Sequence, residues 1–130
     1  MRAEAGAIER VDLEGERLVL STIGGREPIG ICGSGLIAGI AELLEAGVMD
    51  GSGRLASPEE VARPELAARL FRVDKMPAFR LSDSVYITQK DIRELQLAKG
   101  AIRTGIDMML DAVGIDAQEL AHIRLAGNFG

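Results

Sequence analysis

The chain has 130 residues, of which 47% are hydrophobic and 27% charged, and its formal net charge is −5. This length suffices for about one domain with a single core, and the acidic balance argues against nucleic-acid binding, which needs a basic surface. A single cysteine excludes an internal disulfide, and no apolar run is long enough to span a membrane. We expect no signal peptide, since no apolar stretch follows the first four residues. We therefore expect a globular cytoplasmic protein without a membrane or nucleic-acid partner; its oligomeric state is left open.

The first part of the chain predicts a β-hairpin, a short strand and a helix. Residues 7–13 and 17–21 alternate apolar and polar side chains on either side of a Glu-Gly-Glu turn, and residues 28–31 form a third extended segment. Ser34 is the expected N-cap of a helix over residues 35–46 that stops at Gly47. The strand that enters this glycine-rich turn and the helix that leaves it direct free N–H groups to one spot, which favours an anion.

Residues 51–87 are expected to form a small α+β insertion. Ser57 and Pro58 begin a short helix that we expect to be interrupted near Pro64. Short strands follow at residues 71–73, 78–81 and 85–87.

The last third of the chain predicts one long helix. Thr88 precedes it with Asp91 three residues later, a variant of the capping box, and Gly114 ends it. Asp116 then caps a short turn, and residues 123–126 are expected to form a compact buried strand. The helix carries one apolar stripe, made of Ile92, Leu95, Ile102, Ile106, Met109, Leu110 and Val113. Because no helix follows to cover the strand, we expect the chain to be an excerpt of a larger α/β domain.

Four segments carry a resemblance to a known family. They are residues 1–11, the run GICGSGLI at 30–37, the run ITQKDIRELQLAKGAI at 87–102, and LAGNFG at 125–130. Together they resemble the C-terminal ATPase domain of the reductive activators of corrinoid proteins. That domain belongs to the superfamily of acetate and sugar kinases, heat-shock chaperones and actin. The run at 87–102 is the most specific of the four.

The resemblance implies a fold, cofactors and a partner. The fold is α/β, a partial actin-like or ribonuclease H-like subdomain built from the hairpin, the helix, the insertion, the long helix and a core strand. Full-length relatives couple ATP and Mg²⁺ to the reduction of Co(II) in a corrinoid protein, using electrons from an N-terminal [2Fe–2S] domain. This chain has one cysteine, whereas that cluster takes four, and it lacks the family's Asp-Gly-Thr-type phosphate segment. We therefore expect this segment alone not to hydrolyse ATP.

Three groups of residues are the candidate nucleotide site. The first is the turn of Gly33, Ser34 and Gly35, and the second is one face of the long helix, with Gln89, Arg93, Gln96 and Gly100. In relatives this helix lines the adenine pocket, where Arg93 would stack on the base and Gln96 would bond the base or ribose. The third is the final turn, with Gly127, Asn128 and Gly130.

Each group also has a plain structural interpretation. The glycine turns can be tight turns that need small residues, and the polar helical face can be a solvated surface with a Lys90–Glu94 pair. No set of residues has the spacing of a metal site or a catalytic centre, and we expect Asp107 and Asp111 to be solvated.

Two other functions stay open beside ATP binding. One is an interaction module that docks a corrinoid protein without nucleotide. The other is a thiol enzyme in which Cys32, at the start of a helix, is the nucleophile and His122 the base. We favour a small buried residue for Cys32.

Overall fold

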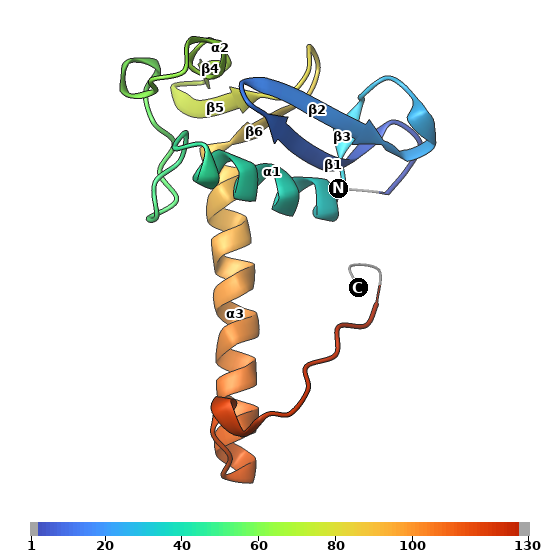
Figure 1. Cartoon of the computed structure of the whole chain (residues 1–130), viewed down its shortest axis with the longest axis vertical. Helices are drawn as coiled ribbons and strands as arrows, with labels where there is room; N and C mark the ends of the chain where they lie inside the picture. The colour runs from blue at the N-terminus through green and yellow to red at the C-terminus, as the bar shows by residue number, and fades with distance from the viewer. Residues whose placement is uncertain (1–2, 128–130) are drawn as a thin grey trace. The chain divides into compact units, whose positions relative to one another are not determined.

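A computed structural model describes residues 3–127 of the chain (Figure 1). The chain divides into two compact units, Met1–Arg93 and Glu94–Gly130. The long helix α3 (Gln89–Val113) begins in the first unit and runs on in the second.

A three-stranded sheet opens the first unit. Strands β1 (Ala7–Glu14) and β2 (Arg17–Thr22) form the predicted hairpin around Gly15, whose φ of 68° suits a glycine. A short 3₁₀ turn, η1 (Ile23–Gly25), leads to β3 (Gly30–Ile31), which pairs in parallel with the other edge of β1. The strand order is β2-β1-β3, so the glycine turn after β3 leaves from beside the central strand.

Helix α1 (Gly33–Glu45) lies very close to its neighbours at two of its three glycines. A Cβ at Gly35 would clash with the backbone oxygen of Ile8, and a Cβ at Gly39 would lie 2.8 Å from Cδ1 of Ile87. The Ile8 oxygen belongs to the backbone and cannot move aside cheaply, whereas Cδ1 of Ile87 is the end of a flexible side chain and can shift. The helix ends as predicted at Gly47, with φ of 73° and a hydrogen bond from Val48 N to Leu43 O of 2.9 Å.

Two small helical turns and an antiparallel sheet complete the first unit. After η2 (Pro58–Glu60) and α2 (Pro64–Ala67) come β4 (Leu70–Val73), β5 (Met76–Arg80) and β6 (Tyr86–Thr88), in the order β4-β5-β6. The β4–β5 turn places two non-glycine residues, Asp74 and Lys75, at positive φ of 48° and 68°, as a tight hairpin turn requires. These strands match the predicted ones to within two residues.

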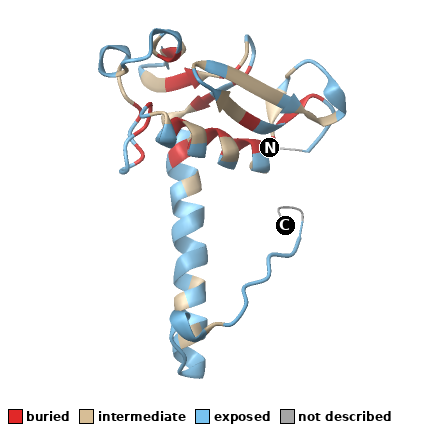
Figure 2. Ribbon diagram, viewed as in Figure 1, coloured by how far each residue is buried: buried red, intermediate tan, exposed pale blue. Residues whose placement is uncertain are grey.

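The core of the first unit joins both sheets and α1. Figure 2 shows buried residues on α1, on both sheets and at the first turn of α3. The largest side chains with less than 2% exposure are Phe79, Ile8, Leu66, Ile87, Ile92 and Val48. The mixed α/β fold with two small sheets and a long helix confirms the predicted fold class, while the role of residues 51–87 as an insertion stays a prediction.

One predicted helix boundary was wrong. Helix α1 begins at Gly33 with Cys32 as N-cap, not at Gly35 with Ser34 as cap, because Leu36 N already bonds Cys32 O at 2.9 Å. The helical segment that begins at Pro58 is interrupted before Pro64, as predicted. Helix α2 then begins at Pro64, because a proline at the first helical position has no N–H to lose.

Helix α3 starts as its sequence predicts. Thr88 N donates to Asp91 Oδ2 at 2.8 Å, and Asp91 N donates to Thr88 Oγ1 at 3.1 Å, so each side chain caps the other's backbone. The helix stops before Gly114, with φ of 71°, and Asp116 caps the short η3 turn (Ala117–Glu119). No helix in residues 3–127 is long and apolar enough to cross a membrane.

The predicted buried strand at residues 123–126 is not present in the second unit. These residues form no strand and no pairing, and Ile123 and Leu125 are 79% and 83% exposed. A strand needs a neighbour for its backbone hydrogen bonds, and within the described residues none is paired with this segment.

We predict that Gly35→Ala destabilises the protein by about 1–3 kcal/mol, since the added methyl meets the fixed Ile8 carbonyl. Urea unfolding followed by circular dichroism measures this difference. Gly30→Ala is the matched control, because a Cβ there meets nothing within 4 Å. Equal stability of the two variants would contradict the close contact.

Candidate functional site

The first predicted nucleotide group, Gly33-Ser34-Gly35, forms the opening turn of α1 and is already engaged by the protein. Ser34 Oγ donates to Glu9 O at 3.1 Å. Gly35 is required by the contact with the Ile8 carbonyl. Contacts within the protein therefore explain the serine at position 34 and the glycine at position 35, and no ligand is needed to explain them.

The Cys32 side chain lies among the N–H groups of that turn. Its sulfur donates to Ile8 O at 3.3 Å and lies 3.2 Å from Ser34 Oγ. Burial alone would raise the pKa of the Cys32 thiol, but hydrogen bonds from the Ser34 side chain and from the Gly35 and Ser34 backbone hold it below the usual value. The residue is only 6% exposed, so a reagent or substrate has little access to the sulfur.

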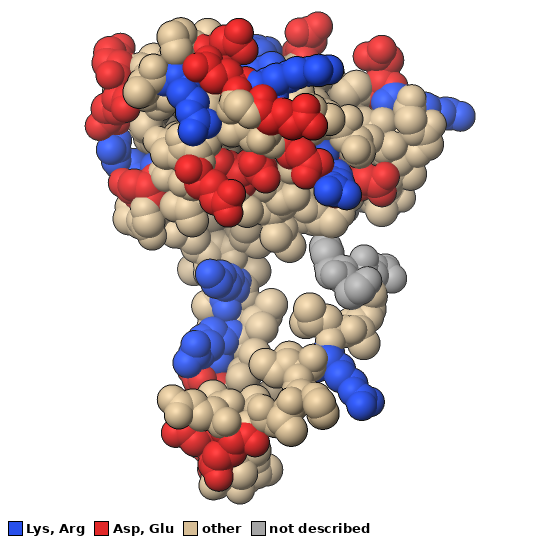
Figure 3. Space-filling model, viewed as in Figure 1, with Lys and Arg blue, Asp and Glu red and all other residues tan. Residues whose placement is uncertain are grey.

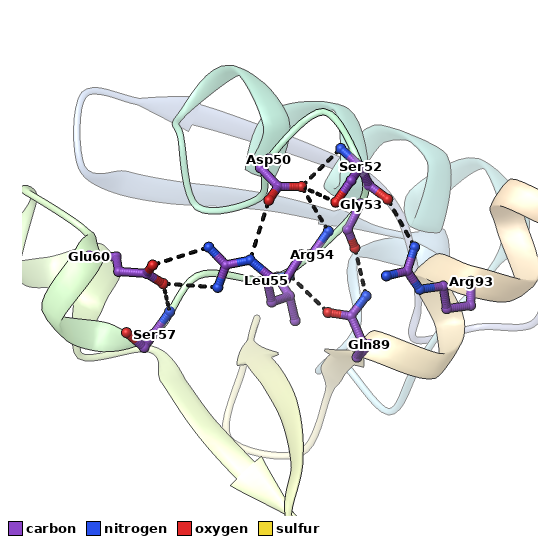
Figure 4. A network of polar contacts seen from close by, with 9 residues as sticks. All are labelled: Asp50, Ser52, Gly53, Arg54, Leu55, Ser57, Glu60, Gln89 and Arg93. Atoms are coloured by element: carbon purple, nitrogen blue, oxygen red, sulfur yellow. Dashed lines mark hydrogen bonds and ion pairs between the residues drawn. The ribbon is translucent and has the colours of Figure 1, made fainter.

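The second candidate region is the loop of residues 50–60, which we call the 50–60 loop (Figure 4). Asp50 organises its first half. Asp50 Oδ1 accepts hydrogen bonds from Ser52 N at 2.9 Å, Ser52 Oγ at 2.6 Å and Arg54 N at 3.1 Å. These bonds lower the pKa of the Asp50 carboxyl from 3.8 to about 2, with the bond from the Ser52 side chain as the largest cause.

Arg54 joins the two halves of the loop. Its Nη1 and Nη2 each lie 3.1 Å from one carboxylate oxygen of Glu60, a bidentate pair, and its Nε lies 3.3 Å from Asp50 Oδ2. Glu60 also accepts from Ser57 N at 2.7 Å, which completes a capping box around η2. The contact with Arg54 is the main cause that lowers the pKa of Glu60 to about 2, and Glu60 in turn raises the pKa of Arg54.

The first turn of α3 holds this loop through Gln89 and Arg93. Gln89 Nε2 donates to Gly53 O at 2.6 Å and Gln89 Oε1 accepts from Leu55 N at 2.8 Å, so one side-chain amide pairs with the backbone as a neighbouring strand would. Arg93 Nη1 donates to Ser52 O at 2.9 Å. Figure 4 shows both side chains directed at the loop.

The structure thus brings together Gln89 and Arg93, but it separates them from the first glycine turn. The turn lies at the N-terminal end of α1 and the 50–60 loop follows its C-terminal end, about 18 Å away by helical rise (Figure 1). Gln96 and Gly100 lie on α3 in the second unit, where a Cβ added at Gly100 would meet nothing within 4 Å. Gly127 has φ of 110°, which favours glycine, whereas Asn128 and Gly130 lie outside the described residues. The nucleotide roles of all these residues stay predictions.

The hollows of the two units do not coincide with these residues. A groove of about 580 Å³ lies between the 50–60 loop and the β4–β5 hairpin, and a shallow hollow of about 470 Å³ lies around Arg103 and Asp116. Neither is lined by a residue of the predicted nucleotide site.

The resemblance implies two inorganic groups, Mg²⁺ and a [2Fe–2S] cluster, and the side chains of this chain can be compared with the needs of each. Across residues 3–127, no group of three or more His, Cys, Asp or Glu side chains has the geometry to hold a metal ion. A [2Fe–2S] cluster does not fit this chain, because a single cysteine cannot supply its ligands.

The predicted thiol nucleophile and its base lie in different environments. His122 is exposed and lies in the second unit. The hydrogen-bond partners of the Cys32 sulfur are Ile8 O and Ser34 Oγ.

The network of Asp50, Arg54 and Glu60 was not predicted from the sequence. Two local signals point to parts of it. Asp-Gly-Ser-Gly at 50–53 is typical of a turn in which an aspartate accepts backbone bonds, and Ser57 with Glu60 has capping-box spacing. The bond from Gln89 to the loop had no sequence signal, since 34 to 36 residues separate its partners.

The fold and the comparisons together define the class of the protein. The family model described as the C-terminal domain of RACo, the ASKHA domain, matches residues 1–130. The chain belongs to this family, as its resemblance predicted.

Two relatives identify the kind of protein in which this domain occurs. The corrinoid activation enzyme RamQ of Eubacterium limosum is 35% identical over 139 residues, which cover 100% of this chain and 23% of that protein. A solved structure named reductive activator for corrinoid, iron–sulfur protein matches with a TM-score of 0.84 and 35% identity, over 100% of this chain and 21% of its own. The chain therefore spans between a fifth and a quarter of the length of these relatives.

We predict that the stability of the 50–60 loop falls as the pH is lowered from about 5 towards 2. Asp50 and Glu60 have folded pKa values of about 2, below their usual 3.8 and 4.5. As the pH falls, these carboxyls bind protons in the unfolded chain before they do so in the folded protein. The folded state is stabilised above the unfolded pKa values, and this stabilisation is lost as the pH falls to the folded pKa values. Chemical denaturation at successive pH values should show a shallower decline for Asp50→Asn than for the wild type. Glu14→Gln, outside the loop, should leave the decline as in the wild type; a decline unaltered by Asp50→Asn would refute the assignment.

We also predict that Gln89→Leu loosens the loop. The variant keeps the size of the side chain but leaves Leu55 N and Gly53 O without these partners, a loss of about 1–3 kcal/mol. Hydrogen exchange should become at least roughly tenfold faster at the Leu55 amide. Gln118→Leu, on the exposed η3 turn, is the control and should leave this amide unchanged. Unaltered exchange in Gln89→Leu would show that the amide pairing does not hold the loop.

Proposed function

We propose that this chain is part of the ATP-binding domain of a reductive activator of corrinoid proteins. In such an activator, ATP binding and hydrolysis are coupled to the transfer of a low-potential electron to the Co(II) corrinoid. The observation that carries the proposal is the family match over all 130 residues, together with relatives at 35% identity whose names state corrinoid activation.

Within this proposal the chain contributes to nucleotide binding and not to electron storage. Its single cysteine cannot ligate an iron–sulfur cluster, so the [2Fe–2S] group would belong to another part of the protein. ATP supplies the free energy, and Mg²⁺ would enter on its phosphates. The partner would be a corrinoid protein.

The polar face of α3 is the proposed adenine side of the site. Gln96 and Gly100 follow Gln89 and Arg93 at helical spacing, so the four share one face. Hydrogen bonds to the 50–60 loop hold the first two side chains of this face, Gln89 and Arg93, in place. We propose that Arg93 both holds the loop and stacks on the base with the face of its guanidinium group.

The final turn would supply the phosphate side of the site. Gly127 has no Cβ, so a ligand can approach its backbone closely, and its φ of 110° favours glycine. The thiol mechanism is the weaker alternative, because the Cys32 sulfur is buried and bonded to Ile8 O and Ser34 Oγ.

We predict that Arg93→Ala and Gly127→Val each weaken the binding of ATP-Mg²⁺ at least roughly tenfold in the full-length protein, about 1.4 kcal/mol. Isothermal titration calorimetry measures the affinity. Arg103→Ala is the matched control, since Arg103 lies on the same helix in an exposed pair with Asp107 and outside the proposed site.

Three results, from this titration, a capture experiment and thiol alkylation, would lead to different conclusions. Wild-type affinity in both variants would reject the proposed site but not ATP binding. Complete absence of ATP binding by the wild type, with capture of the purified corrinoid protein retained, would replace the proposal with a docking module. Rapid alkylation of Cys32 by iodoacetamide at neutral pH would favour the thiol enzyme.

A further inference from the structure

The second unit carries a wide apolar surface on α3. From Leu97 to Val113 the apolar residues recur every three or four positions and cover about half of the helix circumference. The charged residues Lys99, Arg103, Asp107 and Asp111 lie on the opposite half. We call the apolar half the α3 apolar face; its members are Leu97, Ala98, Ala101, Ile102, Gly105, Ile106, Met108, Met109, Ala112 and Val113.

The large side chains of this face are exposed in the chain. Leu97 is 74% exposed, Ile102 65%, Met108 67%, Met109 65% and Val113 67%. Figure 2 shows the exposed colour over most of α3 beyond its first turns. Scattered exposed apolar residues are normal, but a contiguous face of this kind marks an interaction surface.

The middle of the face is lined with small residues. Ala98, Ala101, Gly105 and Ala112 form a shallow track between larger side chains, with Leu97 and Met108 on one side and Ile102 and Met109 on the other. A Cβ added at Gly105 would meet nothing within 4 Å in this chain. Glycine weakens a helix interior, so its presence at this point fits a neighbour that approaches the helix backbone closely.

We infer that the α3 apolar face is a permanent internal interface, covered by polypeptide of the same protein outside residues 1–130, with its closest approach at Gly105. The relatives that match the whole of this chain are more than four times as long, since the chain covers 23% and 21% of them. A covering segment on the same polypeptide is present at high effective concentration, which favours it over a second molecule.

The two glycines of the helix lie on different faces, and the inference does not depend on nucleotide binding. Gly105 lies in the middle of the apolar face, whereas Gly100 lies on the polar half with Arg93 and Gln96. In a helix open to solvent all round, both positions would accept a larger residue equally and gain helix propensity. In a helix covered on the apolar face, only Gly100 would accept one.

The test compares Gly105→Leu with Gly100→Leu in the full-length protein without nucleotide. We expect Gly105→Leu to lower the melting temperature by roughly 5 °C or more, and Gly100→Leu to leave it unchanged or raise it. Unchanged or raised melting temperatures in both variants would overturn the inference.

A second measurement uses the wild-type protein, so it stands even where Gly105→Leu fails to fold. Peroxide oxidation followed by mass spectrometry should proceed at least tenfold more slowly at Met108 and Met109 in the native protein than in guanidinium. Equal rates would overturn the inference. Protection that disappears on dilution, as sedimentation shows dimers giving way to monomers, would assign the face to a second copy and would also overturn it.

Discussion

The contact between the start of α1 and the backbone of β1 is the constraint on which the first unit depends. At Gly35 the helix approaches the Ile8 carbonyl so closely that no side chain fits between them. One turn later Gly39 admits Ile87 of the second sheet to the same helix. Two missing Cβ atoms therefore set the spacing between sheet and helix and allow both sheets to share one core. The positions of Cys32 and Ser34 follow from this approach, because their side chains bond the same strand, at Ile8 and Glu9.

A second kind of order holds the 50–60 loop, where charge and hydrogen bonding replace apolar packing. Asp50, Arg54 and Glu60 are about half exposed, so their ion pairs alone contribute little. Their carboxylates instead collect several backbone and side-chain donors each, which fixes the loop geometry and lowers both pKa values. Figure 3 shows acidic and basic side chains interspersed over the surface around this region, with no large patch of one sign. The loop is thus a locally determined structure attached to the core through α3.

Most elements of the fold could be predicted from the sequence because their signals are local. The hairpin at β1 and β2, the glycine stop of α1 and the Thr88–Asp91 cap of α3 each depend on residues a few positions apart. The prediction of Ser34 as N-cap was wrong because the actual N-cap, Cys32, is held by a distant strand. Its backbone N and its sulfur both donate to Ile8 O in β1, 24 residues earlier in the chain. The strand expected at residues 123–126 did not form, since an apolar run becomes a strand only beside another strand. For the candidate site, the sequence identified which residues share the polar face of α3, but the bonds from Gln89 and Arg93 to the 50–60 loop required the tertiary structure.

The amide of Gln89 has a consequence for how this domain can vary in length. Its oxygen accepts a hydrogen bond from Leu55 N, and its nitrogen donates one to Gly53 O, two positions earlier in the chain. A single inserted or deleted residue between these partners would present the wrong backbone group to each end of the amide. An insertion or deletion within residues 53–55 would therefore break the hydrogen bonds to Gln89. The hairpin turn at Asp74 and Lys75 lies between two paired strands instead, so it can be lengthened without disturbing the start of α3. The Gln89 side chain thus requires a fixed number of residues between Gly53 and Leu55.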